Sequence, residues 1–135
     1  MRSKRLVQIG GAINFLFVVF HLAFWKIFDW PQGLASLSID NRAIMQVFNV
    51  QTAYVLAVFA ALSFAAPDTI STTKLGRSIG LAIAGFWIIR AANQAVFWSM
   101  SVAASWVLVA IFLGTAILYV VPALKLGRPA RTEQG

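Results

Sequence analysis

Three long runs without Asp, Glu, Lys or Arg set the strictest limit on what this chain can fold into. They cover residues 6–25, 43–67 and 91–124. A helix of about 20 apolar residues crosses a hydrocarbon core of about 30 Å, because each residue adds about 1.5 Å. The last run is too long for one crossing, so it holds the end of one span and all of the next. The runs therefore predict an integral membrane protein made of helices.

The composition excludes several classes of function. Of the 135 residues, 60% are hydrophobic and 11% are charged, whereas about 25% are charged in a soluble domain. The chain has no cysteine, which removes disulfides, thiolate metal sites and cysteine nucleophiles. A net charge of +7 would suit nucleic acid, but the basic residues stand at the ends of the apolar runs, where they set membrane orientation. We therefore expect a lipid bilayer as the partner and no nucleic acid.

We expect one all-α domain over residues 1–135, a bundle of four transmembrane helices. Ser38 or Asp40 is suited to cap the second helix. A short polar and basic connection leads from the second helix to the third. Serine hydroxyls favour a tight turn at residues 99–101, and Pro122 is expected to end the fourth helix. The expected spans are residues 6–28, 43–66, 79–98 and 102–122.

Basic residues crowd one side of this predicted membrane. Four spans place both termini on the same side, and eight of the eleven lysines and arginines fall there. Lys26 and Arg42 lie opposite, and Arg90 lies inside a span. The positive-inside rule then predicts that both termini lie in the cytoplasm. The eight residues are Arg2, Lys4, Arg5, Lys74, Arg77, Lys125, Arg128 and Arg131. The opposite surface is expected to carry an aromatic belt of Trp25, Trp30 and Trp98, with Trp106 one turn deeper.

The third span contains the most informative stretch of the chain. Trp87, Arg90, Asn93, Gln94 and Phe97 fall at i, i+3, i+6, i+7 and i+10, which is one face of a helix. A guanidinium inside a span costs about 2.5–3.5 kcal/mol on insertion scales. Some other group must therefore compensate it.

Two interpretations of Arg90 remain open. No predicted span contains an Asp or Glu to neutralise it, which favours an anion-binding group. The alternative is a structural arginine that pairs with Asp29, Asp40 or backbone carbonyls.

Two other spans carry polar stripes at a similar depth. His21 lies in the outer half of the first span, and Gln46 and Asn49 lie in the outer half of the second. Amides and imidazole that faced lipid would lack hydrogen-bond partners, so we expect them to converge with the third span on one pocket. The alternative is that His21 is a buried neutral donor and acceptor and that the amides only hold helices together. Gln51 lies on another face, toward the fourth helix or a second subunit of a homo-oligomer.

The residue types limit the chemistry further. Metal sites need several His, Cys or carboxylate ligands, and one histidine with no intramembrane acid predicts no metal and no cofactor. A nucleophilic triad lacks its partners. Small four-helix multidrug exporters are similar in size, but their function depends on a glutamate in the first helix, where this chain has Asn14 and His21.

The spacing of the polar residues resembles a known layout. The chain has His21-x-x-x-Trp25, then Asn41-Arg42-Ala-Ile-Met-Gln46-x-x-Asn49, then Arg90-Ala-x-x-Gln94. This pattern resembles small four-helix bacterial membrane proteins of unassigned function, and the DoxX-like families are similar in span count. The resemblance covers the whole chain and implies a four-helix bundle in a bacterial inner membrane. It implies no catalytic residue.

These patterns favour one function and leave two others open. We expect the chain to bind or pass a small amphipathic, lipid-like ligand with an anionic or carbonyl group, in a pocket on the periplasmic side. The first alternative is a membrane-embedded enzyme with His21 as general acid–base and Arg90 stabilising negative charge. The second is a structural accessory subunit. The expected ligand-binding residues are His21, Gln46, Asn49, Trp87, Arg90, Asn93 and Gln94.

Overall fold

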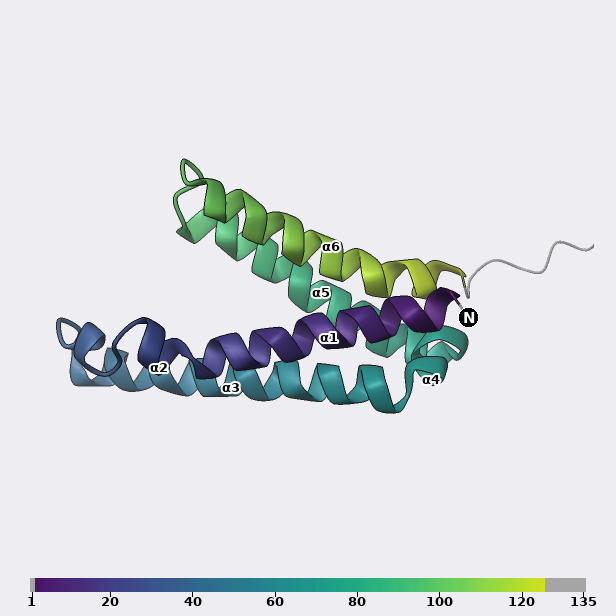
Figure 1. The fold of residues 1–135 in the computed structure, drawn as a ribbon, viewed down its shortest axis with the longest axis horizontal. Helices are drawn as coiled ribbons and strands as arrows, with labels where there is room; N and C mark the ends of the chain where they lie inside the picture. The colour runs from purple at the N-terminus through teal and green to yellow at the C-terminus, as the bar shows by residue number, and fades with distance from the viewer. Residues whose placement is uncertain (1, 126–135) are drawn as a thin grey trace, which may run out of the picture. The chain divides into compact units, whose positions relative to one another are not determined.

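The computed structural model describes residues 2–125, which are helical apart from short turns (Figure 1). Four helices are long and apolar enough to cross a membrane: α1 (Arg2–Leu22), α3 (Ile39–Ala65), α5 (Lys74–Phe97) and α6 (Ala103–Lys125). The shorter elements are α2 (Phe24–Ile27), the 3-10 turn η1 (Gln32–Leu34) and α4 (Pro67–Thr72). No strand occurs among residues 2–125. The predicted all-α class with four transmembrane helices is confirmed, and the chain is a multi-pass membrane protein.

The chain divides into two compact units. Unit 1 takes Met1–Gly10 and Ser63–Gly135, and unit 2 takes Gly11–Leu62. Arg128 and Arg131, two of the eight basic residues counted on the terminal side, lie outside the described residues. The single domain expected over the whole chain stays a prediction.

The helix of the first predicted span, about residues 6–28, has different bounds in the structure. α1 begins at Arg2, and it ends at Leu22 rather than continuing to residue 28. The Ala23 N–H is shared between the Val19 and Phe20 carbonyls, at 3.0 and 3.2 Å, which tightens the backbone before α2 starts. No glycine or proline marks this break, so the sequence pattern could not reveal it.

The second span begins four residues earlier than predicted. Ser38 caps α3, because its Oγ accepts a hydrogen bond from the Asn41 N–H at 3.3 Å. Ser38, rather than Asp40, is thus the cap. Arg42 lies inside the helix instead of ahead of it, and its guanidinium turns back to the Leu37 carbonyl at 3.4 Å.

The polar connection after α3 is helical rather than a loop. Pro67 stands at the start of α4, where its fixed φ and missing N–H cost nothing. Thr73 then caps α5 by accepting the Gly76 N–H at 2.9 Å. The third span consequently starts at Lys74 instead of residue 79. A Cβ at Gly76 would strike the Thr69 carbonyl oxygen, so this glycine permits the close contact between α4 and α5.

The part of the chain around α6 has the predicted turn before the helix, but the helix does not end at the predicted proline. The predicted turn at residues 99–101 is confirmed: Ser99 Oγ lies 2.7 Å from Ser101 Oγ, and the Ser105 hydroxyl bonds the Ser99 carbonyl at 2.8 Å. Pro122 does not end the fourth helix, because α6 continues to Lys125. A proline removes one backbone hydrogen bond, and here its ring is fully buried in unit 1.

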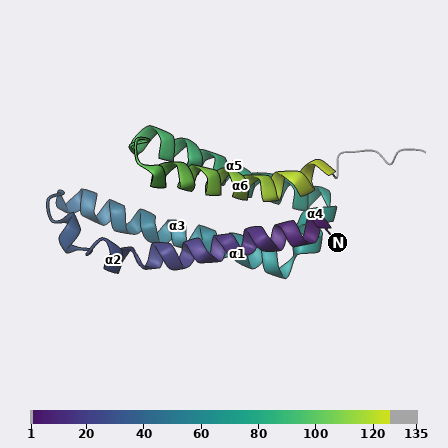
Figure 2. The same ribbon diagram turned by 45° about the horizontal axis from the view of Figure 1, so that its top comes forward.

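Within unit 1, α5 and α6 lie side by side and antiparallel (Figures 1 and 2). Tyr119 is fully buried, and its hydroxyl lies 2.7 Å from Ser63 Oγ. The start of α1 packs on the same ring, since a Cβ at Gly10 would come within 2.5–2.8 Å of Tyr119 atoms. Gly10 therefore allows a close contact between α1 and α6.

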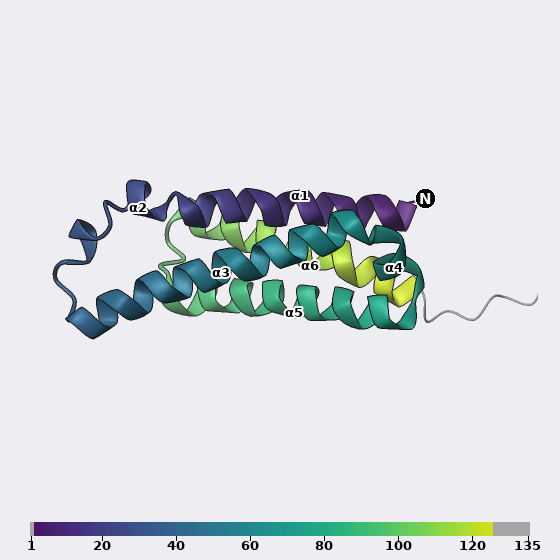
Figure 3. The ribbon, with the colours of Figure 1, turned by 90° about the horizontal axis from the view of Figure 1, so that it is seen from below.

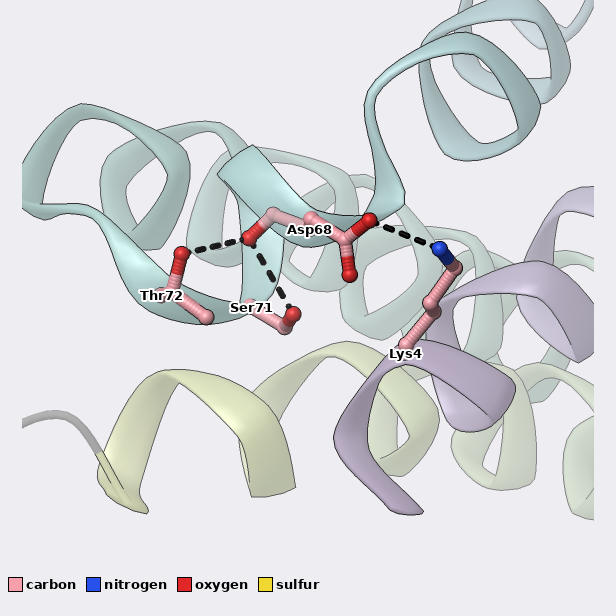
Figure 4. Close-up of polar contacts among 4 residues, drawn as sticks. All are labelled: Lys4, Asp68, Ser71 and Thr72. Atoms are coloured by element: carbon pink, nitrogen blue, oxygen red, sulfur yellow. Dashed lines mark hydrogen bonds and ion pairs between the residues drawn. The ribbon is translucent and has the colours of Figure 1, made fainter. Parts of the chain in front are cut away.

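An ion pair joins the start of α1 to α4. Lys4 Nζ lies 2.7 Å from Asp68 Oδ2 (Figure 4). The Asp68 carbonyl also accepts the Ser71 and Thr72 hydroxyls, at 3.2 and 2.8 Å. The beginning of the chain and the α3–α5 connection thus lie at the same end of unit 1. The two long helices α1 and α3 separate them in the sequence.

Within unit 2, α3 runs antiparallel to α1, and the segment containing α2 and η1 joins them at one end (Figure 3). Aromatic rings gather along that segment. The Phe24 ring lies 4.8 Å from Phe28 and 5.8 Å from Trp30, and Trp25 and Trp30 are 5.5 Å apart. Such clusters suit the membrane–water boundary, where the apolar bodies and polar tips of tryptophans are both accommodated.

Candidate functional site

Arg90 on α5 has partners on its own helix, after the helix and on α6. Its Nη1 donates to Gln94 Oε1 at 3.3 Å. The guanidinium carbon lies 4.7 Å from the centre of the Phe112 ring and 5.3 Å from that of Trp98. Both distances fall in the range of cation–π attraction. Trp87, almost fully buried, packs 5.4 Å from Phe112 and supports its ring.

The direction of the Arg90 side chain changes its effective depth. Arg90 precedes Phe97, the last residue of α5, by seven positions, or about 10 Å of helix. Its guanidinium nevertheless reaches Trp98, beyond the end of the helix. The side chain therefore points along α5 toward the turn at residues 99–101, as long basic side chains do near membrane surfaces.

The charge of Arg90 is compensated only in part. Among the described residues it forms no ion pair, and Gln94 is its one hydrogen-bonding partner. Phe112 and Trp98 supply π faces that attract the cation. They accept no hydrogen bond from the N–H groups, which point outward in the plane of the guanidinium. The side chain is half-buried rather than enclosed. The remaining N–H groups thus have no acceptor among residues 2–125.

The predicted stripe on α5 is only half correct. Trp87 and Gln94 are buried, at 1% and 2% exposure. Asn93 and Phe97 are exposed, Phe97 at 74%. Packing against α6 buries the side of α5 that carries Gln94. Asn93 lies about 100° from Gln94 around the helix, so its side chain stays exposed. Asn93 therefore contributes no contact to the Arg90 cluster, which we define as Trp87, Arg90, Gln94, Trp98 and Phe112.

His21 and Asn49 form a reciprocal pair in unit 2. The His21 Nδ1 lies 2.7 Å from Asn49 Oδ1, and Asn49 Nδ2 donates to the His21 carbonyl at 2.8 Å. The second bond identifies the Asn49 nitrogen, so the atom facing Nδ1 is an acceptor and Nδ1 carries the hydrogen. The His21 ring also stacks on Phe24, with centroids 4.8 Å apart.

Gln46 has a partner on its own helix. Its Nε2 donates to the Arg42 carbonyl at 3.2 Å, within α3. His21, Gln46 and Asn49 thus belong to unit 2, whereas Arg90 and Gln94 belong to unit 1. The common polar pocket expected from the three stripes stays a prediction. No group of three or more His, Asp or Glu side chains gathers within residues 2–125 to hold a metal ion.

The sequence reasoning missed two members of the Arg90 cluster. Trp98 was expected only in an aromatic belt, although its position eight residues after Arg90 left it within reach of a long side chain pointing along the helix. Phe112 gave no signal of its own, because its contact depends on how α5 and α6 are aligned.

Comparisons with known proteins identify no relative of this chain. No protein-family model matches the chain, and neither a curated protein nor a solved structure is significantly similar to it. The likeness to the DoxX-like layout stays a prediction, and the function rests on the geometry alone.

Proposed function

We propose that this protein binds a small amphipathic ligand whose anionic or carbonyl group is held by Arg90. The observation that carries the proposal is the half-buried guanidinium of a membrane span that forms no ion pair among residues 2–125 and keeps only Gln94 as a hydrogen-bond acceptor. A charge in that position costs about 2.5–3.5 kcal/mol on insertion scales. Intramembrane charges are kept where they serve a site, and an anion is the natural complement of this one.

The rings of the cluster support orientation of the guanidinium. Phe112 and Trp98 flank it, so its planar fork is held by contact rather than left to rotate. Gln94 occupies one donor, and the other guanidinium N–H groups keep the capacity to bind an acceptor. An arginine fixed in this manner matches a phosphate or carboxylate with two parallel hydrogen bonds.

The apolar body of the ligand has a surface to lie on. Phe97, seven residues after Arg90 and on the same side of α5, is 74% exposed. Trp106 on α6 donates its indole N–H to the Met100 carbonyl at 2.8 Å and leaves most of its ring exposed. A lipid-like tail would contact these side chains while its polar head met Arg90.

We place this site on the periplasmic side of an inner membrane, with both chain termini in the cytoplasm. The charge bias of the sequence supports that orientation. The Lys4–Asp68 pair supports a shared side for the start of the chain and the α3–α5 connection. The end of α5 near Trp98 is then the opposite, periplasmic end.

Competition between lipids tests the proposal. The purified protein is incubated with equal amounts of a phosphatidylglycerol and a phosphatidylcholine of identical chains, and bound lipid is counted by native mass spectrometry. Wild type should retain the anionic lipid preferentially, and Arg90→Lys should reduce that preference about tenfold, since hydrogen bonds to charged groups contribute about 1.5–3 kcal/mol. Arg77→Lys, the same change near the other end of α5, is the control and should match wild type. Equal retention by wild type and Arg90→Lys would refute the proposal.

One observation favours a structural role for part of the polar set. His21 and Asn49 satisfy each other within unit 2, which is how amides hold membrane helices together. We therefore assign them to helix packing. The enzyme alternative, with His21 and Arg90 acting together, has no supporting contact within either unit.

A further inference from the structure

One face of α3 is exposed along four turns of the helix. Its residues are separated by three and four positions, the spacing of a helix–helix seam. Val47, Val50 and Tyr54 are 52%, 51% and 70% exposed, and the smaller residues are exposed as well. We call this set the Gln51 face: Val47, Val50, Gln51, Tyr54, Ala57 and Ala61.

Gln51 differs from the neighbouring polar side chains of α3 in having no hydrogen-bond partner among residues 2–125. Gln46 donates to the Arg42 carbonyl, Asn49 pairs with His21, and the Thr52 hydroxyl donates to the Phe48 carbonyl at 2.8 Å. The exposed Gln51 amide forms no hydrogen bond with any residue among 2–125. It is the one amide of this stretch whose partner must come from elsewhere.

The depth of Gln51 makes water and lipid poor partners. It lies at the thirteenth of the 27 residues of α3, close to the midpoint of the span. The centre of a bilayer contains neither water nor polar lipid groups, and an unsatisfied amide there costs several kcal/mol. A polar side chain on another protein segment at the same depth would remove that cost.

We propose that the Gln51 face binds the same face of a second copy of this chain. A two-fold dimer brings identical residues together across its axis. Glutamine carries both an acceptor and a donor, so two Gln51 side chains can satisfy each other reciprocally. This self-complementarity is what identifies the partner as a second copy.

The rest of the face fits a close helix pair. Ala57 and Ala61 are separated by four residues, and small residues at that spacing allow two backbones to approach. A groove of about 250 Å³ beside Gln51 is lined by Gln46, Val47, Val50 and Gln51, and it offers space for side chains of the opposite helix. The face carries no charge that would repel its copy.

The absence of cysteine from the natural chain provides a clean test. Val47→Cys places one thiol on the Gln51 face, and Met45→Cys places one at a similar depth on roughly the opposite side of α3. Both variants are oxidised with copper phenanthroline in the membranes of cells that express the full chain. We expect disulfide-linked dimers from Val47→Cys and about tenfold fewer from Met45→Cys.

A second substitution shows whether Gln51 itself carries the association. Adding Gln51→Leu to Val47→Cys should lower dimer formation several-fold, whereas Gln51→Asn should retain most of it because the amide is kept. Leucine at an exposed position of a span leaves insertion and folding intact, and near-wild-type levels of the variant in the membrane check this. Equal cross-linking of Val47→Cys and Met45→Cys would overturn the proposal, as would an unchanged dimer yield with Gln51→Leu. A monomer linked instead to a different protein through Val47→Cys would overturn the choice of a second copy.

Discussion

The side chain of Asn49 holds His21 at two points, its ring nitrogen Nδ1 and its backbone carbonyl, at 2.7 and 2.8 Å. The carbonyl lies in the last turn of α1. One amide thus binds the end of α1 and the imidazole at the same time. This pair connects α1 to α3 in unit 2.

Replacing Asn49 by leucine should destabilise the protein moderately. Hydrogen bonds between membrane helices average about 0.6 kcal/mol, so losing two predicts a drop of about 1 kcal/mol in the free energy of unfolding. Gln46→Leu is the control, because Gln46 bonds only the carbonyl of its own helix. Its effect should stay within about 0.5 kcal/mol. Detergent-titration unfolding measures both, and equal losses would contradict the role given to the pair.

The same geometry fixes the tautomer of His21. Because Asn49 Oδ1 is an acceptor, the neutral imidazole should carry its hydrogen on Nδ1 rather than on Nε2. Nitrogen-15 chemical shifts of histidine-labelled protein distinguish the two tautomers. Asn49→Leu should allow both tautomers to appear. A neutral wild-type ring protonated on Nε2 would be incompatible with the pair.

Gly10 should not tolerate even a methyl group. A Cβ there would lie 2.5 Å from Tyr119 Cε2, and Tyr119 is fully buried and bonded to Ser63. Gly10→Ala should therefore destabilise unit 1 by about 1–3 kcal/mol through overpacking. Gly114→Ala is the matched control, because nothing lies within 4 Å of its Cβ position. That variant should be neutral or more stable, since alanine favours helix. A thermal melt that ranks the two variants in the reverse order would show that Gly10 is not in contact with Tyr119.

The topology predicts where reporters should be active. Fusions to either terminus should report the cytoplasm, and a reporter inserted at Gln32 should report the periplasm, because basic residues cluster on the terminal side. Alkaline phosphatase and fluorescent-protein fusions measure this directly. A periplasmic C-terminus would mean that α5 and α6 do not each cross the membrane.

The four spans could be predicted because charge-free length alone requires them. The turn at Ser99 and Ser101 could be predicted as well, since a 34-residue run without charge cannot be one crossing. The break at Ala23 could not, because neither glycine nor proline marks it. Pro122 was misleading, since a buried proline near a helix end removes only one hydrogen bond.

The candidate site was predictable in its charge and not in its surroundings. An arginine such as Arg90 is conspicuous in an apolar segment. Gln94 follows it by four positions, the spacing at which helical side chains meet, and the structure contains that contact. Its contact with Phe112 depends on the alignment of two helices, which no pattern within one helix encodes. Asn93 fitted the helical stripe equally well, but packing against α6 favoured the other side of Arg90.

The most direct test of the Arg90 site is a set of thermal melts of wild type, Arg90→Lys and Arg90→Leu, each with and without dodecyl phosphate. Dodecylphosphocholine, with the same chain, is the control. Dodecyl phosphate should raise the melting temperature of wild type by several degrees, because a ligand at about 100 times its Kd contributes about 2.7 kcal/mol. Arg90→Lys should respond weakly, since lysine lacks the planar fork.

The melting temperature of Arg90→Leu without ligand decides between a binding site and a structural arginine. Leucine removes an insertion cost of about 2.5–3.5 kcal/mol. It forfeits a Gln94 hydrogen bond of about 0.6 kcal/mol and two cation–π contacts of about 0.5–1 kcal/mol each. We therefore predict that this variant melts at or above the wild-type temperature and does not respond to dodecyl phosphate. A large drop in its melting temperature, together with a wild-type response in Arg90→Lys, would contradict the account.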